Sequence, residues 1–221
     1  MKAVPPLSSS ETTRAALLRA AAEVFAEQGY QLARVRDIAL RAGVNLAAMN
    51  YHFGSKEKLY LAVLQSLAAE RLSAFPLPDA APTRGGRQRL LRFAIRNLLG
   101  RFLATEAPSL LPRLLVRELA NPTPALQTLI ETVARPQFAL LQGVLRSFLG
   151  AQADAQQLRL AAFSILGQCL FYLFARPVAS QLDPALYAGD HSLDRLADHI
   201  ARFSAAGLLA QRQRGAGASH A

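Results

Sequence analysis

The chain has 221 residues, 52% of them hydrophobic, which is enough for one or two domains with a buried core. Its formal net charge of +10 suggests an anionic partner such as nucleic acid or a membrane surface. The single cysteine, Cys169, excludes an intrachain disulfide, and the N-terminus has no apolar run of signal-peptide length. The most apolar segment, near residues 160–175, is too short and too interrupted by Gln168 for a bilayer span, so we expect a soluble cytoplasmic protein without membrane contact.

Helix is expected throughout the chain, because Ala, Leu, Arg and Gln are abundant and no segment alternates with period two. The first helix is predicted to begin at Ser10 as its N-cap and to end at Gly29. Its buried positions recur at helical spacing: Leu17, Ala21, Val24 and Phe25.

A pair of short helices is predicted next. One begins at Val35, Gly43 supplies the turn, and the second runs from about Asn45 to His52 with Met49 and Phe53 facing the core. Two short helices joined by a glycine-containing turn are the helix-turn-helix signature, whose second helix enters the major groove of DNA.

The same stretch resembles the DNA-binding domain of the TetR/AcrR family of bacterial repressors over roughly residues 11–65. The matching motifs are Ile38-Ala39, Ala42-Gly43-Val44, Tyr51-His52, and Phe53, Lys56 and Leu59. Where the family usually has Thr or Ser before the second helix, this chain has Ala33 and Arg34. That departure puts the hydroxyl contact with phosphate in doubt, and Arg34 could replace it.

The predicted DNA contacts follow from this resemblance and from the geometry of the motif. Asn50 can read adenine and Arg36 can reach guanine, whereas the polar groups around the end of the second helix would meet phosphates. The full predicted set is Arg34, Arg36, Asn45, Leu46, Ala48, Asn50, Tyr51, His52 and Lys56. The alternative for these residues is a helical hairpin with solvated polar groups.

The remaining helices are placed by breakers and apolar stripes. Ser55 caps a helix to about residue 73, and later helices span about 87–104, 109–119, 123–149 with a break at Pro136, 154–175 and 192–211. The fold class is all-α with about nine helices: a three-helix helix-turn-helix domain and a larger C-terminal bundle. The predicted divisions are a disordered N-terminus 1–9, the DNA-binding domain 10–55, a connecting helix 56–75, an effector-binding and dimerisation domain 76–210 and a disordered tail 211–221.

A second resemblance, to the CecR-like subgroup of the family, rests on RELANPTPAL at 117–126, ARP at 134–136 and SILGQCLFYLFARP at 164–177. It implies a helical domain that binds an effector and dimerises. The predicted pocket residues are Phe93, Asn97, Arg113, Arg117, Phe138, Gln142 and Phe171. The predicted dimer interface is Phe163, Gly167, Leu170, Phe174, Leu196, Ile200 and Phe203, with a fully buried helix in a monomer as the alternative.

Other polar clusters have simpler explanations. Arg89, Arg92 and Arg96 share one helix face, which favours a solvated face over an anionic site. Arg113 and Arg117 are expected to form a structural ion pair with Glu118. The acidic residues and histidines of 190–199 lie near a helix start, so neither a metal nor a cofactor is expected there or elsewhere.

The predicted function is that of a ligand-responsive DNA-binding repressor, a homodimer on a double-stranded operator released by a small-molecule effector. No phosphate loop, nucleophile elbow or metal-ligand spacing indicates an enzyme. The rival hypothesis is a helical ligand-binding or interaction protein without DNA binding, supported only by Ala33, Arg34 and Asn50.

Overall fold

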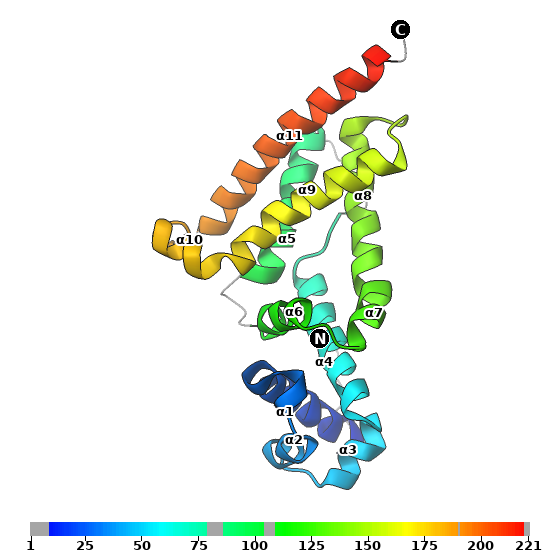
Figure 1. Cartoon of the computed structure of the whole chain (residues 1–221), viewed down its shortest axis with the longest axis vertical. Coiled ribbons are helices and arrows are strands. Elements are labelled where there is room, and N and C mark those ends of the chain that lie inside the picture. Colours follow the sequence, from blue (N-terminus) through cyan, green and yellow to red (C-terminus); the bar gives the residue numbers. More distant parts are fainter. Residues whose placement is uncertain (1–8, 79–85, 104–108, 190, 219–221) are drawn as a thin grey trace, which may run out of the picture. The chain divides into compact units, whose positions relative to one another are not determined.

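The computed structural model describes residues 9–78, 86–103, 109–189 and 191–218, and all the regular secondary structure within them is helical (Figure 1). The all-α fold class is therefore confirmed. The helices are α1 (Ser9–Leu32), α2 (Val35–Ala42), α3 (Leu46–Phe53), α4 (Lys56–Ala74), α5 (Gly86–Leu103), α6 (Leu111–Ala120), α7 (Ala125–Leu129), a π-helical segment (Ile130–Ala134), α8 (Arg135–Leu149), α9 (Ala155–Phe174), α10 (Arg176–Leu182) and α11 (Ser192–Ala218). Residues 1–8 and 219–221, which are expected to be disordered, lie outside the described residues, as do residues 79–85.

Most of the predicted helix ends lie close to the observed ones, and several predictions are wrong. Helix α1 begins at Ser9, so Ser10 is not its N-cap, and Gly29 marks a kink within α1, which continues to Leu32. No helix is predicted between residues 175 and 192, yet α10 forms there, and Pro177 lies in its first turn, where a missing N–H is tolerated. The helix α11 continues to Ala218, so residues 211–218 are not a disordered tail. The break expected at Pro136 lies just before it, in the π-helical segment, and the proline starts α8.

The helices form two compact units. The N-terminal unit comprises Met1–Ala69 and Ser109–Val133, and the C-terminal unit comprises Glu70–Pro108 and Ala134–Ala221. This division differs from the predicted one, in which residues 109–133 belonged with the C-terminal bundle. The reason is packing: Leu114 of α6 and Leu129 of α7 are buried in the same hydrophobic cluster as Phe25 of α1.

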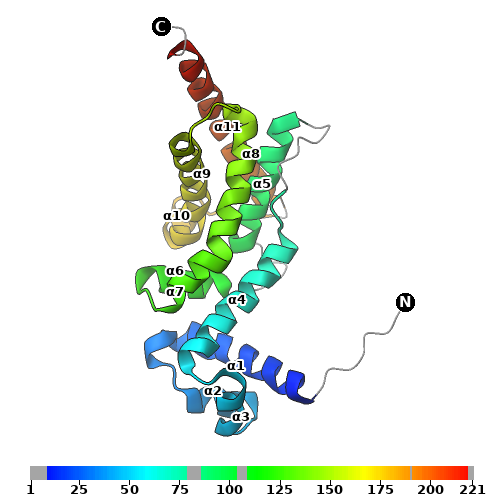
Figure 2. The ribbon, with the colours of Figure 1, turned by 90° about the vertical axis from the view of Figure 1, so that its right-hand side faces the viewer.

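The core of the N-terminal unit lies where α1, α2 and α3 meet the first turns of α4 (Figure 2). All four predicted stripe residues of α1 are buried, as are Met49 and Phe53. Phe25 and Tyr60 pack edge to face, with their ring centroids 4.8 Å apart. Ser55 caps α4 as predicted, because its Oγ accepts a hydrogen bond from the Lys58 N–H at 3.1 Å.

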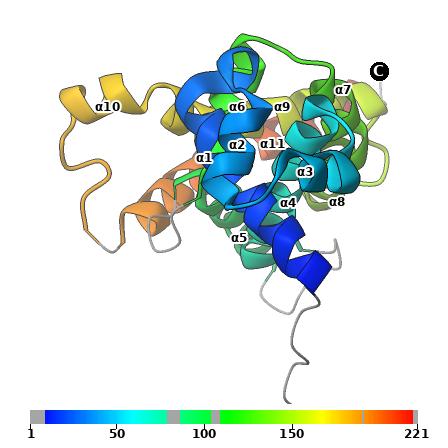
Figure 3. The ribbon, with the colours of Figure 1, turned by 90° about the horizontal axis from the view of Figure 1, so that it is seen from below.

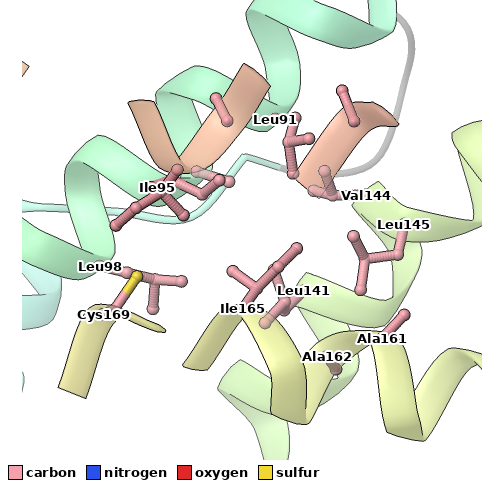
Figure 4. Close-up of a cluster of buried hydrophobic side chains, with 14 of the residues drawn as sticks. Leu91, Ile95, Leu98, Leu141, Val144, Leu145, Ala161, Ala162, Ile165 and Cys169 are labelled. Carbon is pink, nitrogen blue, oxygen red and sulfur yellow. The ribbon is translucent and has the colours of Figure 1, made fainter. Parts of the chain in front are cut away.

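The C-terminal unit has its own core, in which α5 packs against α8, α9 and α11. Figure 4 shows aliphatic side chains from α5, α8 and α9 pointing toward one another, including Ile95, Val144 and Ile165. On the outer side of the α5–α11 contact, Arg96 donates to Asp194 at 2.8 Å and Arg92 pairs with Asp194 and Asp198. Two of the three arginines expected on a solvated face therefore form interhelical ion pairs.

Cys169 lies in this core, as predicted, with no exposed surface. Burial raises the pKa of its thiol to about 12. At pH 8 we expect Cys169 to react with a thiol reagent far more slowly in the native protein than in guanidinium chloride, because burial disfavours the reactive thiolate and keeps the reagent away. Stopped-flow modification of both states measures this ratio, and fast native labelling would contradict the buried position.

Candidate nucleic-acid interface

The turn between α2 and α3 depends on a glycine. Gly43 ends α2 with φ 69° and ψ 27°, a left-handed conformation that other residues rarely adopt. Its N–H and that of Val44 reach back to carbonyl oxygens of α2, Leu40 at 3.1 Å and Ala39 at 3.0 Å. The turn thus provides hydrogen-bond donors for carbonyl groups at the end of α2. It also determines the orientation of α3 relative to α2.

The side chain of Asn45 caps α3, with its Oδ1 accepting a hydrogen bond from the Ala48 N–H at 2.7 Å. Met49 and Phe53, one turn apart, are buried and fix the rotation of α3 about its axis. The exposed residues of α3 are then Leu46, Ala47, Asn50 and Tyr51. At ~100° per residue they cover one continuous arc of about 140°. Figure 3 looks onto α1, α2 and α3.

The predicted DNA contacts all lie on or beside α2 and α3, but not all of them are equally presented. Arg34, Arg36, Asn50 and Tyr51 are exposed, and Tyr51 is 83% exposed. Ala48 is only partly exposed, and its neighbour Ala47 lies on the outer arc instead. Once Met49 and Phe53 are assigned to the buried side of α3, helical periodicity places Ala47 on the opposite, exposed side, so this residue could be identified from the sequence.

The ammonium group of Lys56 already has contacts within the protein. Its Nζ donates to the Gln31 carbonyl at 3.1 Å and lies 4.7 Å from the centroid of the Tyr30 ring. Burial lowers the pKa of this ammonium group. The position near the start of α4 is compatible with a phosphate contact, but Lys56 also joins α4 to the end of α1.

Arg113 and Arg117 of α6 contact the backbone of α1 rather than Glu118. Arg113 donates to the Ala26 carbonyl at 3.4 Å and Arg117 to the Glu27 carbonyl at 3.2 Å, so both serve the packing of α6 on α1. The predicted ion pair with Glu118 is wrong. Glu118 is buried and accepts hydrogen bonds from the Tyr60 hydroxyl at 2.9 Å and from the Thr123 N–H and hydroxyl at 2.8 and 2.9 Å.

The other predicted pocket residues are not gathered either. In the C-terminal unit, Asn97 is buried but already donates to the Pro76 carbonyl at 2.7 Å, while Phe93 and Phe171 are 46% and 55% exposed. Phe138 and Gln142 are partly buried on α8. These positions do not by themselves define an effector pocket.

An apolar face remains exposed on the C-terminal unit. It comprises exposed residues of α9 and α11, one of which, Phe163, also packs against Phe138 with ring centroids 4.9 Å apart: Leu160, Phe163, Gly167, Phe171, Phe174 and Phe203. Leu196 and Ile200 are 6% and 1% exposed inside the protomer's own core, which corrects their placement in a dimer interface. Of the described helices, α9 is also the one long and apolar enough to cross a membrane, a criterion that core helices of globular proteins meet as well.

The sequence matches two known protein families. The profile described as "Bacterial regulatory proteins, tetR family" matches residues 17–63, and that of the CecR dual regulator's C-terminal domain matches residues 87–208. The transcriptional dual regulator CecR of Shigella flexneri is 33% identical over 175 residues, covering 73% of this chain and 76% of that protein. The transcriptional activator FasR of Mycolicibacterium smegmatis is 54% identical over 52 residues, 24% of each chain.

Solved structures share the fold over most of the chain. The Bacillus subtilis transcriptional regulator FadR, solved in complex with stearoyl-CoA, superposes with a TM-score of 0.63 at 19% identity, covering 87% of this chain and 98% of that one. FadR of Bacillus halodurans gives a TM-score of 0.62 at 18% identity, with the same coverage. The helix-turn-helix geometry, both family matches and the relationship to CecR agree, and the chain belongs to the TetR family of transcriptional regulators, with a CecR-type C-terminal domain.

Proposed function

We propose that this protein binds a near-palindromic operator as a homodimer through α2 and α3, represses transcription, and is released by a small molecule that binds its C-terminal unit. The observation that carries DNA binding is the outer arc of α3, which Met49 and Phe53 turn away from the core. In a helix-turn-helix the first residues of the second helix meet base edges. Arg34 and Arg36, exposed at the start of α2, would contact the backbone or a guanine.

Dimerisation is proposed to cover the exposed face of α9 and α11. Contiguous apolar surface that stays exposed in the protomer is typical of an interface. Gly167 and Gly207 have open space around the position of a Cβ atom, so a second pair of helices could approach closely there. A dimer would present two recognition helices to two half-sites one helical turn apart.

Effector release requires a ligand with different affinities for the DNA-binding and released states. The helix α4 is continuous from Lys56 to Ala74, while the boundary between the two units falls within it after Ala69. We propose that a ligand acts through α4 on the spacing of the recognition helices. Stearoyl-CoA is a reasonable first probe in a thermal-shift screen, because it is bound in a protein of the same fold.

The cheapest test of DNA binding is a mobility shift against DNA flanking the protein's own gene, with competitor DNA present. Specific retardation is expected for the wild type. It should be lost with Tyr51→Ala combined with Asn50→Ala, and retained with Leu119→Ala, a truncation on α6 of a leucine that is 49% exposed. Absence of any specific fragment would favour the rival, a helical ligand-binding protein without DNA binding.

Base reading gives a sharper prediction. Asn50→Ala is expected to relax discrimination at one base pair per half-site, by about 1–3 kcal/mol, because an exposed asparagine can donate to and accept from one adenine. Arg36→Ala should do the same at a guanine. Binding-site selection from randomised operators measures both effects, and unchanged preferences in both variants would remove these residues from the base-reading set.

Within this proposal the protein acts in the cytoplasm and has no catalytic role. In the acidic cluster of residues 190–199, Asp194 and Asp198 form ion pairs with Arg92 and Arg96. Asp190, the first residue of that cluster, lies outside the described residues.

A further inference from the structure

The start of the recognition helix is apolar. Leu46 and Ala47 are its first two residues, both are exposed, and Leu46 is 48% exposed. Asn45, the polar residue before them, is turned back onto the helix by its hydrogen bond to the Ala48 N–H. The part of α3 that leads into a major groove therefore carries an isobutyl group and a methyl group rather than hydrogen-bonding side chains.

Such side chains can recognise only one feature of the major groove. Guanine, cytosine and adenine present donors and acceptors there, whereas thymine adds a 5-methyl group. Leu46 or Ala47 against a polar base edge would remove water from that edge without replacing its hydrogen bonds, which is unfavourable. Against a thymine methyl the same contact buries apolar surface on both partners.

A residue on the next turn of α3 could contact the base pair beside the one that Leu46 contacts. Asn50 follows Leu46 by four residues and so lies directly beside it on the exposed arc. An asparagine amide matches the N6 and N7 groups of adenine. Leu46 and Asn50 together suit a short run of T·A and A·T pairs.

We propose that Leu46 and Ala47 determine operator specificity by packing against thymine 5-methyl groups in each half-site. This inference rests on the proposed DNA-binding function and adds the chemical group that is read and the residues that read it. Each methyl contact should contribute about fourfold to affinity per half-site, or about fifteenfold when both half-sites are changed.

The test replaces thymine by deoxyuridine, which lacks only the 5-methyl group and keeps every hydrogen bond. Operator DNA retained in the mobility shift is synthesised with symmetric deoxyuridine pairs at each thymine in turn, and affinities are measured by fluorescence anisotropy at fixed salt. Wild-type protein should lose about fifteenfold at one or two symmetric positions and be unaffected at the others.

The variants assign those positions to residues. Leu46→Ala should bind the thymine operator more weakly and lose its sensitivity to deoxyuridine at one position, and Ala47→Gly should do so at the neighbouring one. Leu119→Ala, which truncates a leucine of equal exposure in the same unit, should keep the wild-type pattern. Circular dichroism confirms folding of each variant.

The possible results distinguish the thymine-methyl contact from operator binding itself. If the protein binds the operator specifically but its affinity changes less than twofold at each thymine position replaced, the proposed methyl contacts are refuted. The operator-binding function is not affected by that result. A Leu46→Ala protein that stays fully sensitive at the same thymine would remove Leu46 from that contact. Failure to bind any flanking DNA would overturn the proposed function and this inference together.

Discussion

Replacing Gly167 by glutamate is expected to convert the proposed dimer into a monomer that is at least as stable as the wild-type protomer. A Cβ atom at Gly167 meets nothing within 4 Å, so the larger side chain fits the protomer without strain. Glutamate also favours helix over glycine by up to about 0.8 kcal/mol. In the middle of the proposed interface, however, its charge would have no partner and would be costly to bury.

Loss of the dimer should reduce operator affinity by about 10²–10⁴, because two linked recognition helices gain an effective concentration that a monomer lacks. Light scattering measures the mass, and anisotropy with operator DNA measures affinity. Gln156→Glu, with the same new charge on an exposed site near the start of α9, should change neither. Ile200→Glu would not be informative, because Ile200 is buried in the protomer's core and the change would unfold it.

A wild-type protein that runs as a monomer at micromolar concentration and still binds operator tightly would refute the interface. So would a dimeric Gly167→Glu variant with unchanged affinity. The first result would leave the exposed face of α9 and α11 without an explanation, and the second would move the interface elsewhere.

Glu118→Ala is expected to destabilise the N-terminal unit by about 3–5 kcal/mol. The carboxylate of Glu118 is buried and accepts three hydrogen bonds, from the Tyr60 hydroxyl on α4 and from the N–H and hydroxyl of Thr123 at the turn into α7. Removing it leaves these donors buried without their acceptor, at roughly 1–3 kcal/mol for each unsatisfied group. Chemical denaturation followed by circular dichroism measures the loss.

Tyr60→Phe isolates one of these bonds and should cost about 1.5–3 kcal/mol, the usual contribution of a hydrogen bond to a charged group. Tyr30→Phe is the matched control, since the Tyr30 ring lies 5.0 Å from that of Tyr60 but makes no comparable bond to Glu118. A loss below 0.5 kcal/mol for Tyr60→Phe, in the range of ordinary surface changes, would refute a structural role for the bond.

The same hydroxyl predicts a dependence on alkaline pH. Burial, and then the hydrogen bond to Glu118, raise the pKa of Tyr60 well above its ordinary value of 10.0. Above pH 10 the unfolded chain loses this proton while the folded protein keeps it, so the free energy of unfolding should fall as pH rises. Tyr60→Phe should flatten this decline, and an identical slope in the variant would contradict the assignment.

Local patterns were sufficient for the DNA-binding helices. Gly43 could be recognised as the turn, and the spacing of Met49 and Phe53 determined which side of α3 faces the core, because both signals act within a few residues. The same spacing also places Ala47 on the exposed side of α3. Local patterns did not predict α10, because a proline can either follow the end of a helix or lie in its first turn, as Pro177 does here.

By itself, the sequence determined the helical class, the helix-turn-helix and the family, because helix periodicity, turn glycines and ordered motifs are properties of neighbouring residues. Only the tertiary structure decided that α6 and α7 pack with the DNA-binding helices, that Glu118 pairs with Tyr60 rather than with Arg117, and that Ile200 is core while Phe203 is surface. These outcomes depend on which faces of distant helices meet. Two apolar stripes look alike along the chain, and only packing shows which one is covered within the protomer and which one stays exposed.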